Sequence, residues 1–81
     1  MKAIVKIKLK NSILDPQGKA VNNALHHLGY DEIEDVRIGK LIELRINGND
    51  LNNIRERIQE ASNKLLANPV IEDYEIEIVE D

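Results

Sequence analysis

The segment 33-IEDVRIGKLIELRIN-47 decides how the chain folds, because its apolar residues can be arranged in two ways. A two-residue turn at Gly39 and Lys40 would make the segment a hairpin. That hairpin would place Val36 opposite Glu43, so each face would mix apolar and charged side chains. A straight chain instead gathers the apolar residues on one face, with Lys40 as the exception. The pattern therefore predicts one long middle strand, bulged at Gly39. The apolar face of this predicted strand comprises Val36, Ile38, Ile42, Leu44 and Ile46.

The spacing of apolar residues predicts the other elements. Period-two alternation indicates strands with one buried face, and spacings of three and four indicate helices. Asp15 is a suitable N-cap for the first helix, Pro16 suits its first position, and Gly29 suits its end. The predicted elements are strands over residues 2–10 and 71–79 and helices over residues 16–28 and 51–66. The helical apolar faces comprise Val21, Ala24, Leu25 and Leu28 in the first helix and Leu51, Ile54, Ile58, Ala61 and Leu65 in the second.

The order β-α-β-α-β predicts an α+β fold, a single domain over residues 1–81, related to the ferredoxin-like topology. The first strand carries lysines on one face and the last carries acidic residues, so we expect these two strands to be antiparallel neighbours. Both helices are expected to cover the opposite, apolar face. A bent middle strand of about 14 residues would reach about 45 Å, too far for one small domain to cover. The sequence therefore predicts a homodimer, or a tetramer of two such dimers, with a shared sheet.

Composition excludes several classes of function. The net charge is −4, and the chain has no Phe or Trp, which argues against nucleic-acid binding. It has no Cys, which removes disulfides and thiolate chemistry. No apolar run approaches the roughly 20 residues of a membrane span, and the lysine-rich start is unlike a signal peptide. We therefore expect a cytoplasmic protein.

No stretch of the sequence predicts a catalytic, cofactor-binding or metal site. His26 and His27 are adjacent on a helix, so their rings point about 100° apart and cannot chelate one metal well. The acidic run from Glu72 onward is interpreted as a solvated strand face that opposes the lysines. Neither the Asp15–Gly18 stretch nor Gly39-Lys40 matches a phosphate-binding loop. The residues alone thus favour a binding or structural module over a free-standing enzyme.

Three blocks of sequence carry a resemblance to a known family. LDPQGKAV (14–21), VRIGKLIEL (36–44) and LLANPVIEDYEIEI (65–78) stand in the order and spacing of the PurS family, the small subunits of phosphoribosylformylglycinamidine (FGAM) synthase. The resemblance covers essentially the whole chain. It implies a PurS-like fold and a dimeric, non-catalytic accessory subunit of de novo purine biosynthesis.

In that family's reaction, formylglycinamide ribonucleotide (FGAR) becomes its amidine (FGAM) with consumption of ATP and glutamine. The resemblance implies two partners: a large synthetase subunit, PurL, which uses ATP and Mg, and a glutaminase subunit, PurQ, which releases ammonia. This chain would bridge them and carry no cofactor itself. The candidates for partner contact are Asp15, Pro16, Gln17, Gly18, Arg37, Gly39 and Lys40. The alternative is a small regulatory ligand-binding module of ferredoxin-like topology, with a pocket near Gly39 and Lys40.

Overall fold

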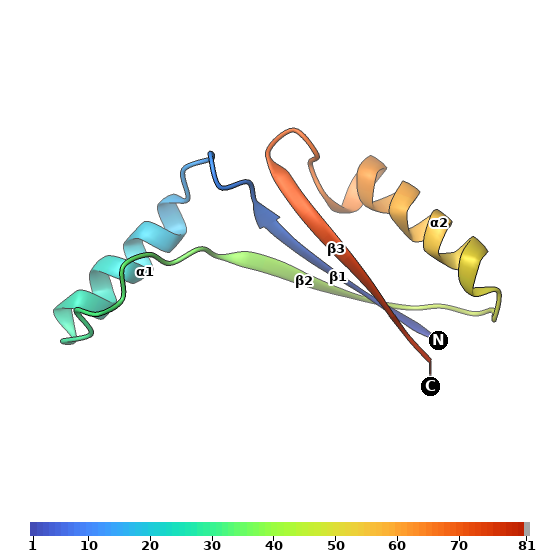
Figure 1. The fold of residues 1–81 in the computed structure, drawn as a ribbon, viewed down its shortest axis with the longest axis horizontal. Helices are drawn as coiled ribbons and strands as arrows, with labels where there is room; N and C mark the ends of the chain where they lie inside the picture. The colour runs from blue at the N-terminus through green and yellow to red at the C-terminus, as the bar shows by residue number, and fades with distance from the viewer. Residues whose placement is uncertain (81) are drawn as a thin grey trace.

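The computed structural model describes residues 1–80 and confirms the predicted order of elements (Figure 1). Asp15 and Asp50 cap the starts of the two α-helices, as their short acidic side chains favour. A short π-helical turn, η1, continues the second helix, and together they cover the predicted range. The elements are β1 (Lys2–Leu9), α1 (Pro16–His27), β2 (Gly39–Arg45), α2 (Leu51–Ala61), η1 (Ser62–Leu66) and β3 (Glu72–Val79).

The three strands form an antiparallel sheet in the order β2-β1-β3, which confirms that the first and last strands are neighbours. Lys6 lies opposite Glu75, and its Nζ is 3.8 Å from a carboxylate oxygen of Glu77 on the same face. Lys2 lies opposite Val79, so both chain ends meet at one end of the sheet (Figure 1). The lysines of β1 and the acidic residues of β3 thus lie on the same face of the sheet, as predicted.

The core is small and lies between the sheet and α2. Three inward side chains of β1, those of Ala3, Val5 and Ile7, are fully or almost fully buried, and Ile54 of α2 is 7% exposed. Leu65 departs from the predicted apolar stripe, since it is 83% exposed while Ala67 is buried. The cause is η1, in which the Ala67 N–H donates to the carbonyl of Ser62, five residues earlier. This wider turn breaks the 3.6-residue period and turns Leu65 outward.

The middle strand is shorter than predicted. β2 contains seven residues, and its pairing with β1 keeps a constant register, so Gly39 begins the strand and forms no bulge. Ile42, Leu44 and Ile46 share the half-buried face, as predicted. Val36 and Ile38 lie before the strand and pair with no sheet neighbour. Their backbone N–H groups donate to aspartate side chains, at distances of 3.0 and 2.7 Å, in place of a strand.

The prediction that both helices cover one face is wrong for α1. In the described part of the chain, α2 packs on the sheet, whereas α1 extends beyond its end (Figure 1). The apolar face of α1 is consequently open: Val21 is 37% exposed and Leu28 is 73% exposed. The reason is that the chain turns away after Leu9 and is held there by contacts with the segment before β2. We call α1 with the following residues 28–35 the α1 arm.

The resulting molecule is elongated. Its extents are 49 × 28 × 14 Å and its radius of gyration is 16.2 Å, against about 12 Å for a compact domain of this length. Its accessible surface is 6193 Å², against about 4,900 Å² for a compact monomer of 9.2 kDa. The chain thus exposes roughly 1,300 Å² more than a self-contained domain of its mass.

Candidate partner-binding site

The predicted contact residues of the first block meet the segment before β2 at one corner, which we define as Asp15–Gly18 with Val36–Ile38. Asp15 is its centre. One carboxylate oxygen accepts from the backbone N–H of Gly18 at 2.8 Å, and the other accepts from that of Ile38 at 2.7 Å. These two hydrogen bonds, with the nearby Arg37 guanidinium, hold the pKa of Asp15 below its usual value although its burial opposes this. At 5% exposed, Asp15 is a structural link and offers little contact area.

Arg37 braces the corner from the other side. One guanidinium nitrogen, Nη2, donates to the carbonyl of Lys10 at 2.8 Å and to that of Ile13 at 2.7 Å. Both acceptors belong to the loop that leaves β1, and Lys10 itself donates to the carbonyl of Ile71 before β3 at 2.8 Å. Arg37 therefore ties the segment before β2 to the end of the sheet.

Gly18 lets the first turn of α1 approach this segment. A Cβ atom at this position would lie 2.0 Å from the carbonyl oxygen of Val36, well inside van der Waals contact. No larger residue fits without moving the backbone. The glycine is therefore required by close packing of the helix against the chain, which the sequence pattern alone did not reveal.

The outward surface of the corner consists of Pro16 and Gln17, which are exposed, with Leu14, which is 72% exposed. The first block of candidate residues thus divides into two kinds. Asp15 and Gly18 are buried and shape the corner, whereas Pro16 and Gln17 present a surface. Leu14 was not among the predicted contact residues, although its place in a turn, directly before an N-cap, indicates an exposed side chain.

Gly39 and Lys40 directly follow the corner, at the start of β2. A Cβ on Gly39 would lie 2.6 Å from the carbonyl oxygen of Ile7, so this glycine lets β2 approach β1 closely. An open hollow of about 570 Å³ lies beside it. Most of its lining side chains, such as Lys8, Leu41 and Glu75, belong to the sheet face that α2 leaves uncovered.

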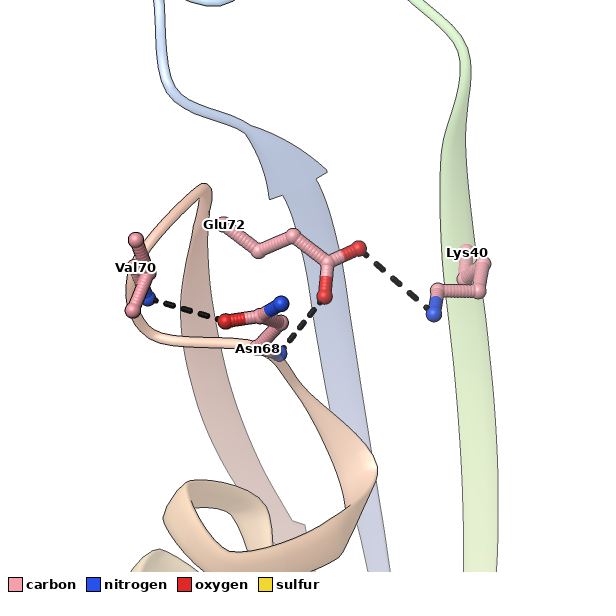
Figure 2. A network of polar contacts seen from close by, with 4 residues as sticks. All are labelled: Lys40, Asn68, Val70 and Glu72. Carbon is pink, nitrogen blue, oxygen red and sulfur yellow. Dashed lines mark hydrogen bonds and ion pairs between the residues drawn. The ribbon is translucent and has the colours of Figure 1, made fainter.

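Lys40 takes part in a polar network that crosses the end of the sheet (Figure 2). Its Nζ is 3.5 Å from one carboxylate oxygen of Glu72, whose other oxygen accepts from the backbone N–H of Asn68 at 2.7 Å. The Asn68 side chain in turn accepts from the N–H of Val70 at 3.1 Å. The network therefore orders the turn between η1 and β3, and Lys40 has a structural partner.

The histidines make local contacts with backbone carbonyls. His26 Nε2 is 2.6 Å from the carbonyl oxygen of Ile33, and His27 Nδ1 is 2.8 Å from that of Asn23. Within residues 1–80, no three His, Asp or Glu side chains gather so that they could hold a metal ion. In the same part of the chain, no helix is both long and apolar enough to cross a membrane.

The chain is thus a small α+β protein with one helix that does not pack on the sheet and a braced corner that faces outward. The sequence profile of the PurS family, described as phosphoribosylformylglycinamidine (FGAM) synthase, matches residues 2–80. The phosphoribosylformylglycinamidine synthase subunit PurS of Bacillus subtilis is 51% identical over 79 residues, which are 98% of this chain and 93% of that protein. This chain therefore belongs to the PurS family, the small subunits of a glutamine-dependent ligase of purine biosynthesis.

Solved structures share the fold. A structure of Bacillus subtilis PurS matches with a TM-score of 0.88 at 51% identity and covers 98% of each chain. A chain in the structure of PurLQS from Thermotoga maritima matches with a TM-score of 0.85 at 26% identity, over 94% of this chain and 93% of that one. The departure of α1 from the sheet is thus part of a fold that experimental structures share closely.

Proposed function

We propose that this chain is the bridging subunit of a cytoplasmic FGAM synthase. It would hold a glutaminase subunit, PurQ, beside an ATP-dependent synthetase subunit, PurL, so that ammonia from glutamine converts FGAR to FGAM. The observation that carries this proposal is the close match, over 94% of the chain, to a chain of a PurLQS structure. The chain's own part would be contact and orientation, with ATP and Mg used by the synthetase.

The homodimer is part of this proposal, and the exposed area supports it. The roughly 1,300 Å² of excess surface is larger than the approximately 800 Å² that each partner contributes to a standard interface. Two apolar surfaces are available for such an interface. One is the open face of α1, with Leu25 half-buried and Leu28 exposed; the other is the β2 part of the core face, where Ile42 and Leu44 stay half-buried beside α2.

A second copy can satisfy both surfaces, because α1 points away from its own sheet and cannot reach it. Residues 34–38 continue the line of β2 beyond the sheet (Figure 1), and both edges of the sheet, β2 and β3, are unpaired in one chain. We therefore assign the segment 34–38 and α1 of one copy to the β2 side of the other. In this arrangement Val36 and Ile38 lie at the junction of two copies, and the sheet is shared.

Contacts with the larger subunits belong to the exposed residues of the first block. Pro16 and Gln17, with Leu14 beside them, form a rigid projection, since the hydrogen bonds of Asp15 fix the turn that carries them. We retain Asp15, Gly18 and Arg37 as residues that shape this surface. Gly39 and Lys40 stay candidates through the hollow beside them.

Reconstitution tests the proposal directly. Glutamine-dependent FGAM formation is measured with PurL and PurQ, with and without this chain. We expect activity only when all three are present, with ammonia-dependent activity of PurL much less affected by omission of the chain. Equal glutamine-dependent activity without the chain would contradict the bridging role. A double substitution, Pro16→Ser with Gln17→Ser, tests the projection, and Lys19→Ser on the same helix is the matched control.

A second candidate function, the ligand-binding module, rests on the hollow beside Gly39, which lies where such a pocket is predicted. A thermal-shift screen against amino acids and nucleotides separates the two candidates. A rise of several degrees with one small ligand, abolished by Leu41→Glu in the hollow, would favour the sensor over the bridge.

A further inference from the structure

Few contacts connect the α1 arm to the rest of the chain, and they concentrate at the corner. The helix reaches the segment before β2 through the Asp15 carboxylate, and that segment reaches the end of the sheet through Arg37. The bonds form one path: from the Gly18 N–H to Asp15, from Asp15 to Ile38, and from the adjacent Arg37 to the loop after β1. Within residues 1–80, the core cluster of the sheet includes no residue of α1 that would supply a second path.

The two N-cap aspartates of the chain differ in how many of their carboxylate oxygens accept a hydrogen bond. Asp50 caps α2 by accepting from the N–H of Asn53 at 3.3 Å, and it is exposed. Asp15 caps α1 in the same way but uses its other oxygen for Ile38, 23 residues further along the chain. Capping needs only one carboxylate oxygen. The second oxygen of Asp15 is therefore not needed for capping, and its hydrogen bond with Ile38 serves to link the helix to the segment before β2.

We propose that Asp15 and Arg37 form a clasp that sets the direction of the α1 arm before subunits associate, so that both are positioning residues for the subunit interface. An arm without packing on its own sheet would otherwise swing about residues 10–14 and 34–38. Ordering a mobile segment on association reduces affinity, and fixing it beforehand avoids that loss. The effect on association rests on the proposed homodimer, whereas the fixed direction of the arm does not.

The substitution Asp15→Asn separates the clasp from the cap. Asparagine caps helices about as well as aspartate, but its side chain offers one acceptor oxygen and one NH₂ donor. Whichever way the amide turns, its NH₂ faces a backbone N–H, and one of the two hydrogen bonds is lost. Asp50→Asn is the matched control, because it changes an N-cap whose side chain accepts one hydrogen bond among the described residues, from Asn53. Arg37→Met removes the guanidinium donors and keeps most of the apolar stem, so it tests the Arg37 half of the clasp independently.

Two measurements read the outcome. The first is the width of the distance distribution between spin labels on Asn23→Cys in α1 and Gln59→Cys in α2, in labelled chains diluted with unlabelled ones. The sequence has no natural Cys to interfere. The second is the dimer dissociation constant from sedimentation. Circular dichroism confirms that each variant keeps its helices.

We expect a narrow distribution for the natural chain and for Asp50→Asn, and at least a doubled width for Asp15→Asn and Arg37→Met. The dissociation constant should rise tenfold or more in the last two only. An unchanged width in a folded Asp15→Asn variant would overturn the clasp. A broadened distribution with an unchanged dissociation constant would overturn its role in association. A natural chain that stays monomeric would remove the proposed homodimer, and the widths would still decide whether the arm is fixed.

Discussion

Replacing Gly18 with alanine should destabilise this protein, although the same change in most helices has the opposite effect. The added Cβ would lie 2.0 Å from the Val36 carbonyl oxygen, and real Cβ contacts stay beyond 3.0 Å, so the segment must retreat by about 1 Å. A movement of that size takes the hydrogen bond from Ile38 to Asp15, now 2.7 Å, beyond hydrogen-bonding distance. Overpacking of this kind costs about 1–3 kcal/mol. The helix-propensity gain of alanine is at most about 1 kcal/mol and is smaller in the first turn.

We therefore expect the free energy of unfolding to fall by about 1–3 kcal/mol. Urea unfolding followed by circular dichroism measures it, at several protein concentrations because association is linked to stability. Lys19→Ala, at the exposed neighbouring position, is the control and should stay within about 0.5 kcal/mol of the natural chain. A Gly18→Ala chain as stable as the natural one would refute the close approach of α1 to residues 36–38.

Four further predictions follow from the same contacts. Ile42→Asp places an unpaired charge on the core face and should cost several kcal/mol, so sedimentation and circular dichroism should show loss of dimer and fold. Glu72→Ala removes an ion pair with Lys40 and the side-chain acceptor of the Asn68 backbone N–H, and should cost about 1–2 kcal/mol in urea unfolding, whereas Glu72→Gln, which keeps an acceptor oxygen, should cost less than about 1 kcal/mol. Changing both His26 and His27 to Gln should leave folding and reconstituted activity nearly intact, and a loss of activity would contradict their local role. Because the pKa of Asp15 is lowered by folding, its contribution to stability is present above its ordinary value of 3.8 and is lost as the pH falls further. The difference in free energy of unfolding between the natural chain and Asp15→Asn should therefore become smaller as the pH is lowered below that value.

The sequence was sufficient to predict those elements whose side chains alternate between water on one face and the core on the other. The lysines of β1 and the acidic residues of β3 alternate with apolar residues, and this pattern predicted both strands and their pairing. The capping residue Asp15 likewise located the start of the first helix, because capping depends on atoms only three residues away.

The sequence was insufficient where a residue's partner lies far along the chain. Val36 and Ile38 alternate as a strand does, but alternation shows only which residues share a face and not whether a neighbouring strand is present. The second oxygen of Asp15 binds a backbone N–H 23 residues away, which no local pattern encodes. Leu65 was placed inward because a uniform 3.6-residue period was assumed through η1.

The apolar face of α1 was identified from the sequence, but the surface that it packs against was predicted wrongly. Val21 and Leu28 were predicted to lie on an apolar helix face that is buried within the same chain. In the structure they remain exposed, which makes the same pattern a signal for association.

The central place of β1 in the sheet also affects how the chain acquires its structure. Of the three strands, β1 is synthesised first, and its two neighbours are residues 39–45 and 72–79, so its second edge stays open until β3 has been made. Contacts between residues this distant in sequence slow folding. We conclude that the sheet closes only after β3 has been synthesised, and that Val5 and Ile7 stay accessible on the growing chain until then. A circular permutant that joins β3 to β1 through a short turn would make these contacts local and should fold faster.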